Sequence, residues 1–373
     1  AAARAELRAG EGAAAAGVAR LRGSADAAVA PLGTALLSAL GRTEARHFTA
    51  PRRPPKTWGA RSVVYYTGRT LEAWEPERLA SGLGGSETAV VQLARRWAAA
   101  GIEVVVYLRL PAGRATVEWG GATFVDVSEF EPSDQFATLI VWRSLEVLDL
   151  PLRARTLLLD LHDMPIAGEM SAARLEKVDC VIVKSHFQHS ALPPAARQRP
   201  CAVIPNGVDG EVAAQVVAEV AAEARSAEPV LVYTSSYDRG LEEMLRHGWR
   251  RIRGALPTAT LHLYYGWQTH ELMCPKSEWR EMMRELIATS AGVVDHGRVG
   301  QRELLLAKAR ADLHYYVTTW PEIDCIAVRE SAMVGTVPLT SAGGVFGEKE
   351  YSVRVKGDPR EAAMQREAAR IAI

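Results

Sequence analysis

Residues 62–108 read SVVYYTGRTLEAWEPERLASGLGGSETAVVQLARRWAAAGIEVVVYL. The run SVVYY (62–66) is apolar and rich in β-branched and aromatic residues, as expected of a buried strand, and EVVVYL (103–108) repeats that pattern. Between them, residues 86–101 carry apolar side chains at helical spacing and end in a glycine. A buried strand, a helix and a second buried strand predict a parallel sheet with helices on its faces.

The same alternation of strand and helix continues along the chain. Further strands of a first series are predicted at ATLIVW (137–142), TLLLDL (156–161) and CVIVK (180–184), and AVIPNGVD (202–209) ends that series. After a helical connector at 210–228, a second series is predicted at VLVYTSS (230–236), LHLYY (261–265), GVVDHG (292–297), ADLHYYV (311–317) and VPLTS (337–341). Two such series predict two doubly wound, Rossmann-like α/β domains, with ligands bound in an interdomain cleft beyond the carboxyl ends of the strands.

The predicted domains are residues 58–207 and residues 208–373. Residues 1–57 are rich in Ala and Arg and include PRRPPK (51–56). We expect this extension to be helical or disordered and to lie outside the catalytic unit. A transit peptide is the alternative, although acidic residues such as Glu6 and Glu11 are uncommon in such peptides.

Composition narrows the classes of function. The 373 residues suffice for two cores, and 44 basic residues balance 44 acidic ones, which argues against a dedicated nucleic-acid binder. No stretch approaches the roughly 20 apolar residues that span a bilayer, so membrane contact would be peripheral. The four cysteines form no CxxC pair, which is consistent with a cytoplasmic location or the cytosolic face of a membrane.

The first candidate site segment is GLGGSET (82–88). Gly84 and Gly85 would let the backbone approach a ligand, and the following helix offers unpaired N–H groups to an anion. These glycines come too late after the strand for a dinucleotide fingerprint, which disfavours a nicotinamide dehydrogenase. An ordinary loop between strand and helix is the alternative interpretation.

The second candidate site segment contains a histidine. His162, in LHDMP (161–165), follows a predicted strand and is expected to face the cleft. His186 and His189 are three residues apart on a predicted helix and are more typical of a solvated face than of a metal site. No other histidine completes a metal-binding pattern, so no metal or other cofactor is expected.

The third candidate is the turn TSSYDRGLEEML (234–245). Ser236 lies in the turn, and Arg239 stands at the start of the next helix, where a guanidinium can bind phosphate oxygens in a bidentate manner. A surface arginine that caps a turn is the alternative.

The fourth candidate is WPEIDCIAVRESAMVGTVPLTSAGG (320–344). Glu322 is predicted in a loop after a strand, and Glu330 on a helix within reach of the same ligand. A carboxylate accepts hydrogen bonds from two hydroxyl groups at once, which suits recognition of a sugar or a ribose. A solvated helix face with two glutamates is the alternative.

Taken in order, these segments resemble family 4 of the retaining glycosyltransferases (glycosyl transferases group 1), which have the GT-B fold. The resemblance covers about residues 61–350 and rests on five segments: GGSETAVVQLARRWAAAGIEVVVY, the His-Asp pair, VIPNGVD, RGLEEML and PEIDCIAVRESAMVGTVPLTSAGGVFGE. It implies transfer of a sugar, with hexose most expected, from a nucleotide-sugar donor to a glycan, lipid, protein or small-molecule acceptor. It also implies retention of anomeric configuration, without a metal.

The resemblance assigns roles position by position. His162, Arg239 and Glu322 would be the catalytic residues: His162 faces the transferred sugar, Arg239 neutralises the leaving diphosphate, and Glu322 binds the donor sugar. Glu330 would bind the ribose. The remaining donor-binding positions are Gly84, Gly85, Ser236 and the backbone around Asp324, Cys325 and Ile326.

One departure from the family pattern concerns the diphosphate. The family carries a second basic residue a few positions before the place of Arg239, where this chain has SSYD (235–238). Arg298 is a candidate to supply the second cation. This departure is the main support for one alternative, a degenerate module that binds the sugar nucleotide without turnover. A sugar-nucleotide epimerase or hydrolase on the same fold is a second alternative.

Overall fold

The computed structural model describes residues 48, 51, 53–164, 168–224 and 226–373. Nearly all of the predicted N-terminal extension therefore lies outside the described residues. The chain divides into two compact units. The first unit comprises Ala1–Glu77, Val90–Lys184 and Gln188–Ile204, and the second comprises Arg78–Ala89, Ser185–Phe187 and Pro205–Ile373. The chain passes from the first unit to the second for the last time after Ile204, close to the domain boundary predicted after residue 207.

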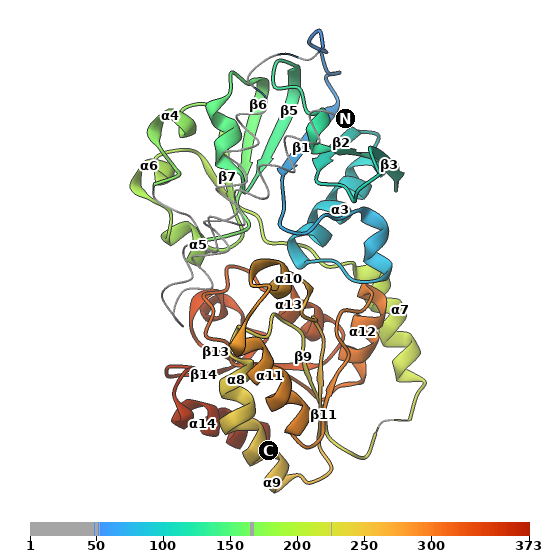
Figure 1. The fold of residues 1–373 in the computed structure, drawn as a ribbon, viewed down its shortest axis with the longest axis vertical. Coiled ribbons are helices and arrows are strands. Elements are labelled where there is room, and N and C mark those ends of the chain that lie inside the picture. The colour runs from blue at the N-terminus through green and yellow to red at the C-terminus, as the bar shows by residue number, and fades with distance from the viewer. Residues whose placement is uncertain (1–47, 49–50, 52, 165–167, 225) are drawn as a thin grey trace. The chain divides into compact units, whose positions relative to one another are not determined.

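The first unit contains an eight-stranded sheet of order β3-β4-β2-β1-β5-β6-β7-β8 (Figure 1). All neighbouring strands are parallel except the edge pair β3–β4. The strands are β1 (Ser62–Gly68), β2 (Glu103–Leu108), β3 (Thr116–Trp119), β4 (Ala122–Asp126), β5 (Gln135–Trp142), β6 (Arg153–Asp160), β7 (Cys180–Val183) and β8 (Cys201–Val203).

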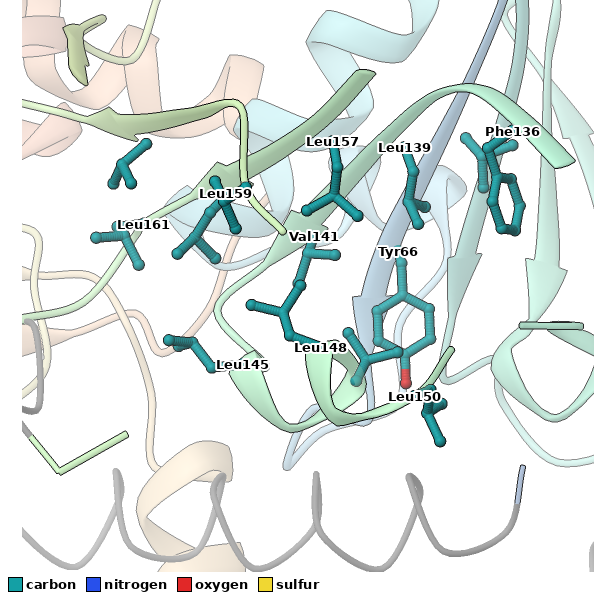
Figure 2. Packing of buried hydrophobic residues seen from close by; sticks show 14 of the residues in the cluster. Tyr66, Phe136, Leu139, Val141, Leu145, Leu148, Leu150, Leu157, Leu159 and Leu161 are labelled. Carbon is teal, nitrogen blue, oxygen red and sulfur yellow. The ribbon is translucent and has the colours of Figure 1, made fainter. Parts of the chain in front are cut away.

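The core of this unit follows from the alternation of side chains along parallel strands. Leu139 of β5 is in register with Leu157 of β6, and Val141 is in register with Leu159. Because successive side chains point to opposite faces, these four lie on one face of the sheet. Figure 2 shows them facing Leu148 of the short helix after β5, and all five are buried. The helical segments before β8 are η2 (Pro76–Ala80), α3 (Gly85–Ala99), η3 (Val127–Glu129), η4 (Leu145–Asp149), α4 (Ala172–Leu175), α5 (His186–Ser190) and α6 (Pro194–Arg197). Most of η2 and the first turns of α3 and α5 belong to the second unit.

The hairpin β3–β4 was not predicted from the sequence. Its strands are short, but Gly120 and Gly121 between them have φ of 58° and 81°. Two consecutive residues with positive φ form the two-residue turn that matches the twist of a hairpin, and glycine adopts this conformation without strain. The pair of glycines was therefore the available signal.

The described residues before β1 pack on the first unit. Phe48 is buried in its core. The buried carboxylate of Asp134 accepts two hydrogen bonds from Arg53, at 2.7 and 2.8 Å, one from the Lys56 N–H at 2.7 Å and one from the Trp58 indole at 3.1 Å. The end of the predicted extension is thus fixed to the first unit.

The second unit contains a six-stranded sheet of order β11-β10-β9-β12-β13-β14, parallel throughout. Its strands are β9 (Val230–Tyr233), β10 (Thr260–Leu263), β11 (Val293–Asp295), β12 (Leu313–Tyr316), β13 (Val337–Ser341) and β14 (Val353–Val355). The two sheets, one in each unit and parallel apart from the edge pair β3–β4, confirm the predicted α/β class. None of the helices in the described part of the chain is long and apolar enough to cross a membrane.

The helices of the second unit alternate with these strands. The connector α7 ends at Ala221, earlier than the predicted end at 228. Asp209 caps it by accepting the Val212 N–H at 3.3 Å. The helices are α7 (Gly210–Ala221), α8 (Leu241–Glu243), the π-helical turn η5 (Met244–Trp249), α9 (Arg250–Ala255), α10 (Gln268–Met273), α11 (Glu278–Thr289), α12 (Gln301–Arg310), α13 (Ile326–Met333), η6 (Gly344–Glu348) and α14 (Ala362–Ala372).

Candidate functional site

The candidate site of the second unit lies where the adjacent strands β9 and β12 end. The turn at 234–240 follows β9, and the loop at 317–325 follows β12. Because β9 and β12 are parallel neighbours, their carboxyl ends meet at one edge of the sheet, the edge at which doubly wound folds bind ligands. This topology brings two predicted segments together that are about 80 residues apart in sequence.

Arg239 and Glu322 are in direct contact in this region. Nη1 of Arg239 donates to Oε1 of Glu322 over 2.8 Å, and the hydroxyl of Tyr316 donates to the same oxygen over 2.5 Å. The guanidinium also lies over the ring of Trp320, 4.8 Å from its centroid. Burial lowers the pKa of Arg239, but the charge of Glu322, together with smaller contributions from Tyr316, Tyr265 and Asp238, more than offsets burial and raises that pKa. The cation is therefore permanent, and its charge is held beside a carboxylate.

Gly240 allows the turn to approach the end of β12. Its φ is 98°, and a Cβ there would lie 3.1 Å from the carbonyl oxygen of Val317. The turn is also tied to the strands: Ser235 shares a 3.0 Å hydrogen bond with Tyr316, and the carbonyl of Ser236 accepts one from Tyr233 over 2.8 Å. Ser235, Ser236 and Arg239 are thus held close to the Glu322 loop.

The predicted donor-binding backbone lies at the start of α13. Cys325, just before the helix, has a φ of 55°. A left-handed conformation is costly for a residue other than glycine and persists only where the surrounding structure enforces it. The helix α13 begins directly after this residue, and its first N–H groups, beginning at Ile326, have no partner within the helix.

The side chain of Asp324 holds this turn in place. Its buried carboxylate pairs with Arg329 and with Lys349, whose Nζ lies 3.1 Å away, and accepts the N–H of Asn206 over 2.9 Å. Arg329 in turn donates to the carbonyl of Asn206 over 2.5 Å. Asp324 therefore acts on the turn through its side chain, a role that the sequence did not suggest.

Glu330 is buried and engaged by a lysine. Its Oε2 lies 2.6 Å from Nζ of Lys308 on α12, and its Oε1 accepts a 3.4 Å hydrogen bond from Gln301. Lys308 has no exposed surface and also donates to the carbonyl of Ala327 over 2.9 Å. The alternative of a solvated helix face is wrong for Glu330, because an ion pair of this kind keeps both charges out of water.

The glycine segment belongs to the second unit. A Cβ on Gly85 would lie 3.5 Å from Cδ1 of Ile326, so these two predicted donor-binding residues are neighbours. The carboxylate of Glu87 occupies the space where Gly84 would carry a Cβ. Arg298 packs against Gly82, and it donates to Thr269 over 3.0 Å and to the carbonyl of Tyr265 over 3.3 Å. Its proposed role as the second diphosphate cation stays a prediction.

His162 lies in the first unit, directly after β6. Nε2 of His162 is 3.2 Å from Oδ2 of Asp160, and its ring packs against Trp142 with centroids 5.5 Å apart. Asp160 also pairs with Lys184 and accepts from the hydroxyl of Tyr65. Burial lowers the pKa of His162, and Asp160 only partly offsets that effect. His162 is therefore neutral at neutral pH.

Among the described residues, no group of three or more His, Cys, Asp and Glu side chains could hold a metal ion. His186 and His189 lie on α5, where His186 is exposed, in agreement with the interpretation as a solvated face.

The similarity of this chain to known proteins lies in its structure. No family model matches the sequence, and no curated protein matches it. A sucrose-phosphate synthase (tll1590) from Thermosynechococcus elongatus is 16% identical, with 83% of this chain and 89% of that chain covered at a TM-score of 0.61. The UDP-forming alpha,alpha-trehalose-phosphate synthase from Burkholderia xenovorans, in complex with glucose-6-phosphate, is 11% identical, with coverages of 84% and 92% at a TM-score of 0.62.

Anabaena Alr3699/HepE, in complex with UDP and glucose, is 15% identical, with coverages of 84% and 94% at a TM-score of 0.53. These structures are GT-B glycosyltransferases. The chain has the GT-B fold. Identities this low establish the GT-B fold of the chain and leave membership of family 4 and the retaining mechanism as predictions.

Several residues that contact the predicted site residues were missed by sequence reasoning. They are Tyr316 and Lys308 in the second unit, with Asp160, Lys184 and Tyr65 in the first. Tyr316 and Asp160 are the last residues of β12 and β6. Polar residues at the carboxyl ends of buried strands were the available signal, because such ends face the ligand edge of the sheet. Lys308 gave no comparable signal, since a lysine on a helix is usually solvated.

Proposed function

We propose that this chain is a glycosyltransferase of family 4 that moves a sugar, with hexose most expected, from a nucleotide-sugar donor to an acceptor. The proposed reaction retains the anomeric configuration and needs no metal. The observation that carries the proposal is the contact between Arg239 and Glu322. It places a permanent cation beside a carboxylate at the ligand edge of a parallel sheet.

This pairing matches the chemistry of a nucleotide sugar. In such a donor the diphosphate is bonded directly to the anomeric carbon, so a cation for phosphate and an acceptor for sugar hydroxyls must lie within a few ångströms of each other. When the bond from the anomeric carbon to oxygen breaks, negative charge develops on the diphosphate. A fixed guanidinium lowers that barrier because it needs no reorganisation. Tyr316 supports the arrangement by fixing the acceptor oxygen of Glu322.

The other residues take supporting roles in the proposal. Gly84, Gly85, Ser236 and the backbone of Asp324, Cys325 and Ile326 surround the donor phosphates and sugar. Glu330 accepts the ribose hydroxyls while Lys308 holds its carboxylate, and His162 faces the transferred sugar. The wide spread of these residues along the sequence is typical of a site built from loops at strand ends.

The similar structures suggest where to begin the search for substrates. They are complexes with UDP and glucose, with UDP-glucose and with glucose-6-phosphate. We therefore propose a UDP-hexose as the first donor and a sugar phosphate as the first acceptor to test. Glycan, lipid and protein acceptors remain part of the proposal, with a cytoplasmic location or peripheral contact with the cytosolic face of a membrane. Nucleic acid is not proposed as a partner.

The decisive experiment measures products from UDP-, GDP- and ADP-sugars with and without a panel of acceptors. A transferase consumes donor mainly when acceptor is present, and the product anomer reports retention. An epimerase or hydrolase consumes donor without acceptor, and a degenerate module binds donor without turnover. Either of those results would replace the proposal. A thermal-shift screen first reduces the number of candidate donors, because a ligand at 100 times its Kd adds about 2.7 kcal/mol of stability.

A further inference from the structure

The ion pair of Arg239 with Glu322 is made through a single carboxylate oxygen. Nη1 of Arg239 donates to Oε1 of Glu322 over 2.8 Å, and the structure shows no second hydrogen bond between these two described side chains. Guanidinium and carboxylate groups frequently pair through two parallel hydrogen bonds, one to each oxygen. Several other pairs in this chain do so: Arg53–Asp134, Arg174–Asp149, Arg310–Glu223 and Arg370–Glu367.

The oxygen that Arg239 binds is also held by a phenol. The hydroxyl of Tyr316 donates to Oε1 of Glu322 over 2.5 Å. Burial raises the pKa of Tyr316, and the charge of Glu322 adds to that effect, so the phenol keeps its hydrogen. Because this single hydrogen goes to Glu322, the hydroxyl of Ser235 must be the donor in its 3.0 Å hydrogen bond with Tyr316. The phenol oxygen is thereby fixed from two sides.

The ring of Tyr316 is too tightly packed to follow a movement of Glu322. It is fully buried at the end of β12 and packs edge to face against Tyr233, with ring centroids 5.6 Å apart, and against Phe346, with centroids 6.0 Å apart. A carboxylate that turned both oxygens toward the guanidinium would have to move Oε1 away from this hydroxyl. Tyr316 therefore opposes the form of the ion pair that has two hydrogen bonds.

A single hydrogen bond to Glu322 leaves most of the guanidinium of Arg239 available. Among the described residues, Glu322 is the one acceptor to which the structure shows this guanidinium donating. Trp320 lies against the guanidinium, 4.8 Å from the ring centroid, and restricts its orientation. The Arg239 side chain is 29% exposed, so its remaining N–H groups can be reached by phosphate oxygens.

We propose that Tyr316 is a positioning residue that keeps the pair of Arg239 and Glu322 in its single-bond form, so that the guanidinium presents its remaining N–H groups to the diphosphate. This inference rests on the proposed function and adds a residue that itself contacts neither the sugar nor the phosphates. Without the phenol, Glu322 turns and binds Arg239 through both oxygens. The carboxylate then competes with the diphosphate for the same N–H groups.

The experiment is calorimetric titration of the full chain with UDP, GDP and ADP, continued with the one that wild type binds most tightly. These probes lack the transferred sugar, so sugar binding by Glu322 does not enter. We expect Tyr316→Phe to weaken binding about tenfold, as for one hydrogen bond to a charged group. In Tyr316→Phe/Glu322→Gln the competing side chain is neutral, so the affinity should return to that of Glu322→Gln alone. A merely structural role of Tyr316 predicts no such recovery.

The neighbouring tyrosine on β12 supplies the matched control. Tyr315 is as buried as Tyr316, and its hydroxyl donates to the carbonyl of Gln365 over 3.3 Å, so Tyr315→Phe should bind the nucleotide as wild type does. If Tyr316→Phe is unstable, Ser235→Ala/Tyr316→Phe takes its place, because it removes both ends of the buried hydrogen bond between these residues.

A crystal structure of the Tyr316→Phe variant gives a second measurement that needs no ligand. We expect two hydrogen bonds between Arg239 and Glu322 in that variant. An ion pair that keeps its single hydrogen bond, an unchanged nucleotide affinity in Tyr316→Phe, or no recovery in the double variant would overturn the proposal. Failure of the proposed function is seen separately, as a wild-type chain that binds none of the three nucleotides.

Discussion

The guanidinium of Arg239 and the carboxylate of Glu322 are bonded over 2.8 Å, although 83 residues separate them in sequence. The Glu322 side chain is 9% exposed and that of Arg239 is 29% exposed. Each group therefore neutralises a charge that is largely withdrawn from water. Any change to one of them alters the electrostatics of the other, which makes this pair the first target for mutation.

Arg239→Ala removes the cation proposed to neutralise the leaving diphosphate. We expect kcat to fall by roughly 10²- to 10³-fold, as when a preorganised charge-stabilising donor is lost. Glu322→Gln keeps the shape of the side chain and removes its charge, and we expect a smaller loss. Steady-state kinetics with a confirmed donor measure both. Arg246→Ala, which removes a surface pair with Glu242 and a contact with the sulfur of Met282, is the control. Full turnover in both Arg239→Ala and Glu322→Ala would exclude the assignment.

Lys308→Met leaves Glu330 buried without its cation. We expect the free energy of unfolding to fall by about 3–5 kcal/mol, because an uncompensated buried charge is strongly destabilising. The double variant Lys308→Met/Glu330→Met should recover most of that stability, since replacing both partners by apolar groups is often nearly neutral. It should nevertheless lose affinity for UDP if Glu330 binds the ribose. Urea denaturation and calorimetric titration separate the two effects, and equal stabilities of the single and double variants would contradict the ion-pair account.

Because His314 is buried, we expect the free energy of unfolding to fall in mild acid. It is fully buried between Thr234 and Ser331, and burial, followed by the charge of Lys308, lowers its pKa well below the usual value near 6.5. Below about pH 6.5 the unfolded chain therefore binds a proton that the folded chain does not. Stability should fall as the pH decreases, by up to about 1.4 kcal/mol per pH unit for this one group.

Urea denaturation at about pH 7.5 and about pH 5.5 tests this expectation. His314→Gln should show a weaker dependence on pH, whereas substitution of the exposed His186 by Gln should leave the dependence unchanged. His162 acts in the same direction in the first unit, so the transition of the second unit must be followed separately. An identical slope in wild type and His314→Gln would refute the prediction.

Substitutions of Cys325 test whether the backbone is strained at the start of α13. Its φ of 55° suits glycine, so Cys325→Gly should be neutral or stabilising by about 1 kcal/mol, offset by the small loss of packing. Cys325→Val should destabilise by more than about 1 kcal/mol, because a branched Cβ fits that conformation worst. Thermal unfolding of the two variants gives the comparison. Greater stability of the valine variant would show that the turn relaxes in solution.

Much of the fold was readable from local pattern. EVVVYL matches β2 and VPLTS matches β13, because continuous apolar runs of this length have few alternatives to a buried parallel strand. The predicted helix at 86–101 appears as α3, shifted by one or two residues. The hairpin β3–β4 and the strand β14 were missed, since their short sequences, TVEW, ATFVD and VRV, contain charged residues and form no continuous apolar run.

The candidate site, like the fold, was predicted from the sequence only in part. The sequence by itself determined which types of residue follow the predicted strands, including Arg239, Glu322 and His162, because the positions of strands and helix starts along the chain follow from short-range periodicity. The partners of these residues were decided by the tertiary structure alone. Tyr316 on Glu322, Lys308 on Glu330 and Asp160 on His162 depend on which strands and helices become neighbours. That neighbourhood is set by sheet order and helix packing, which act between residues far apart in the chain and leave no local pattern.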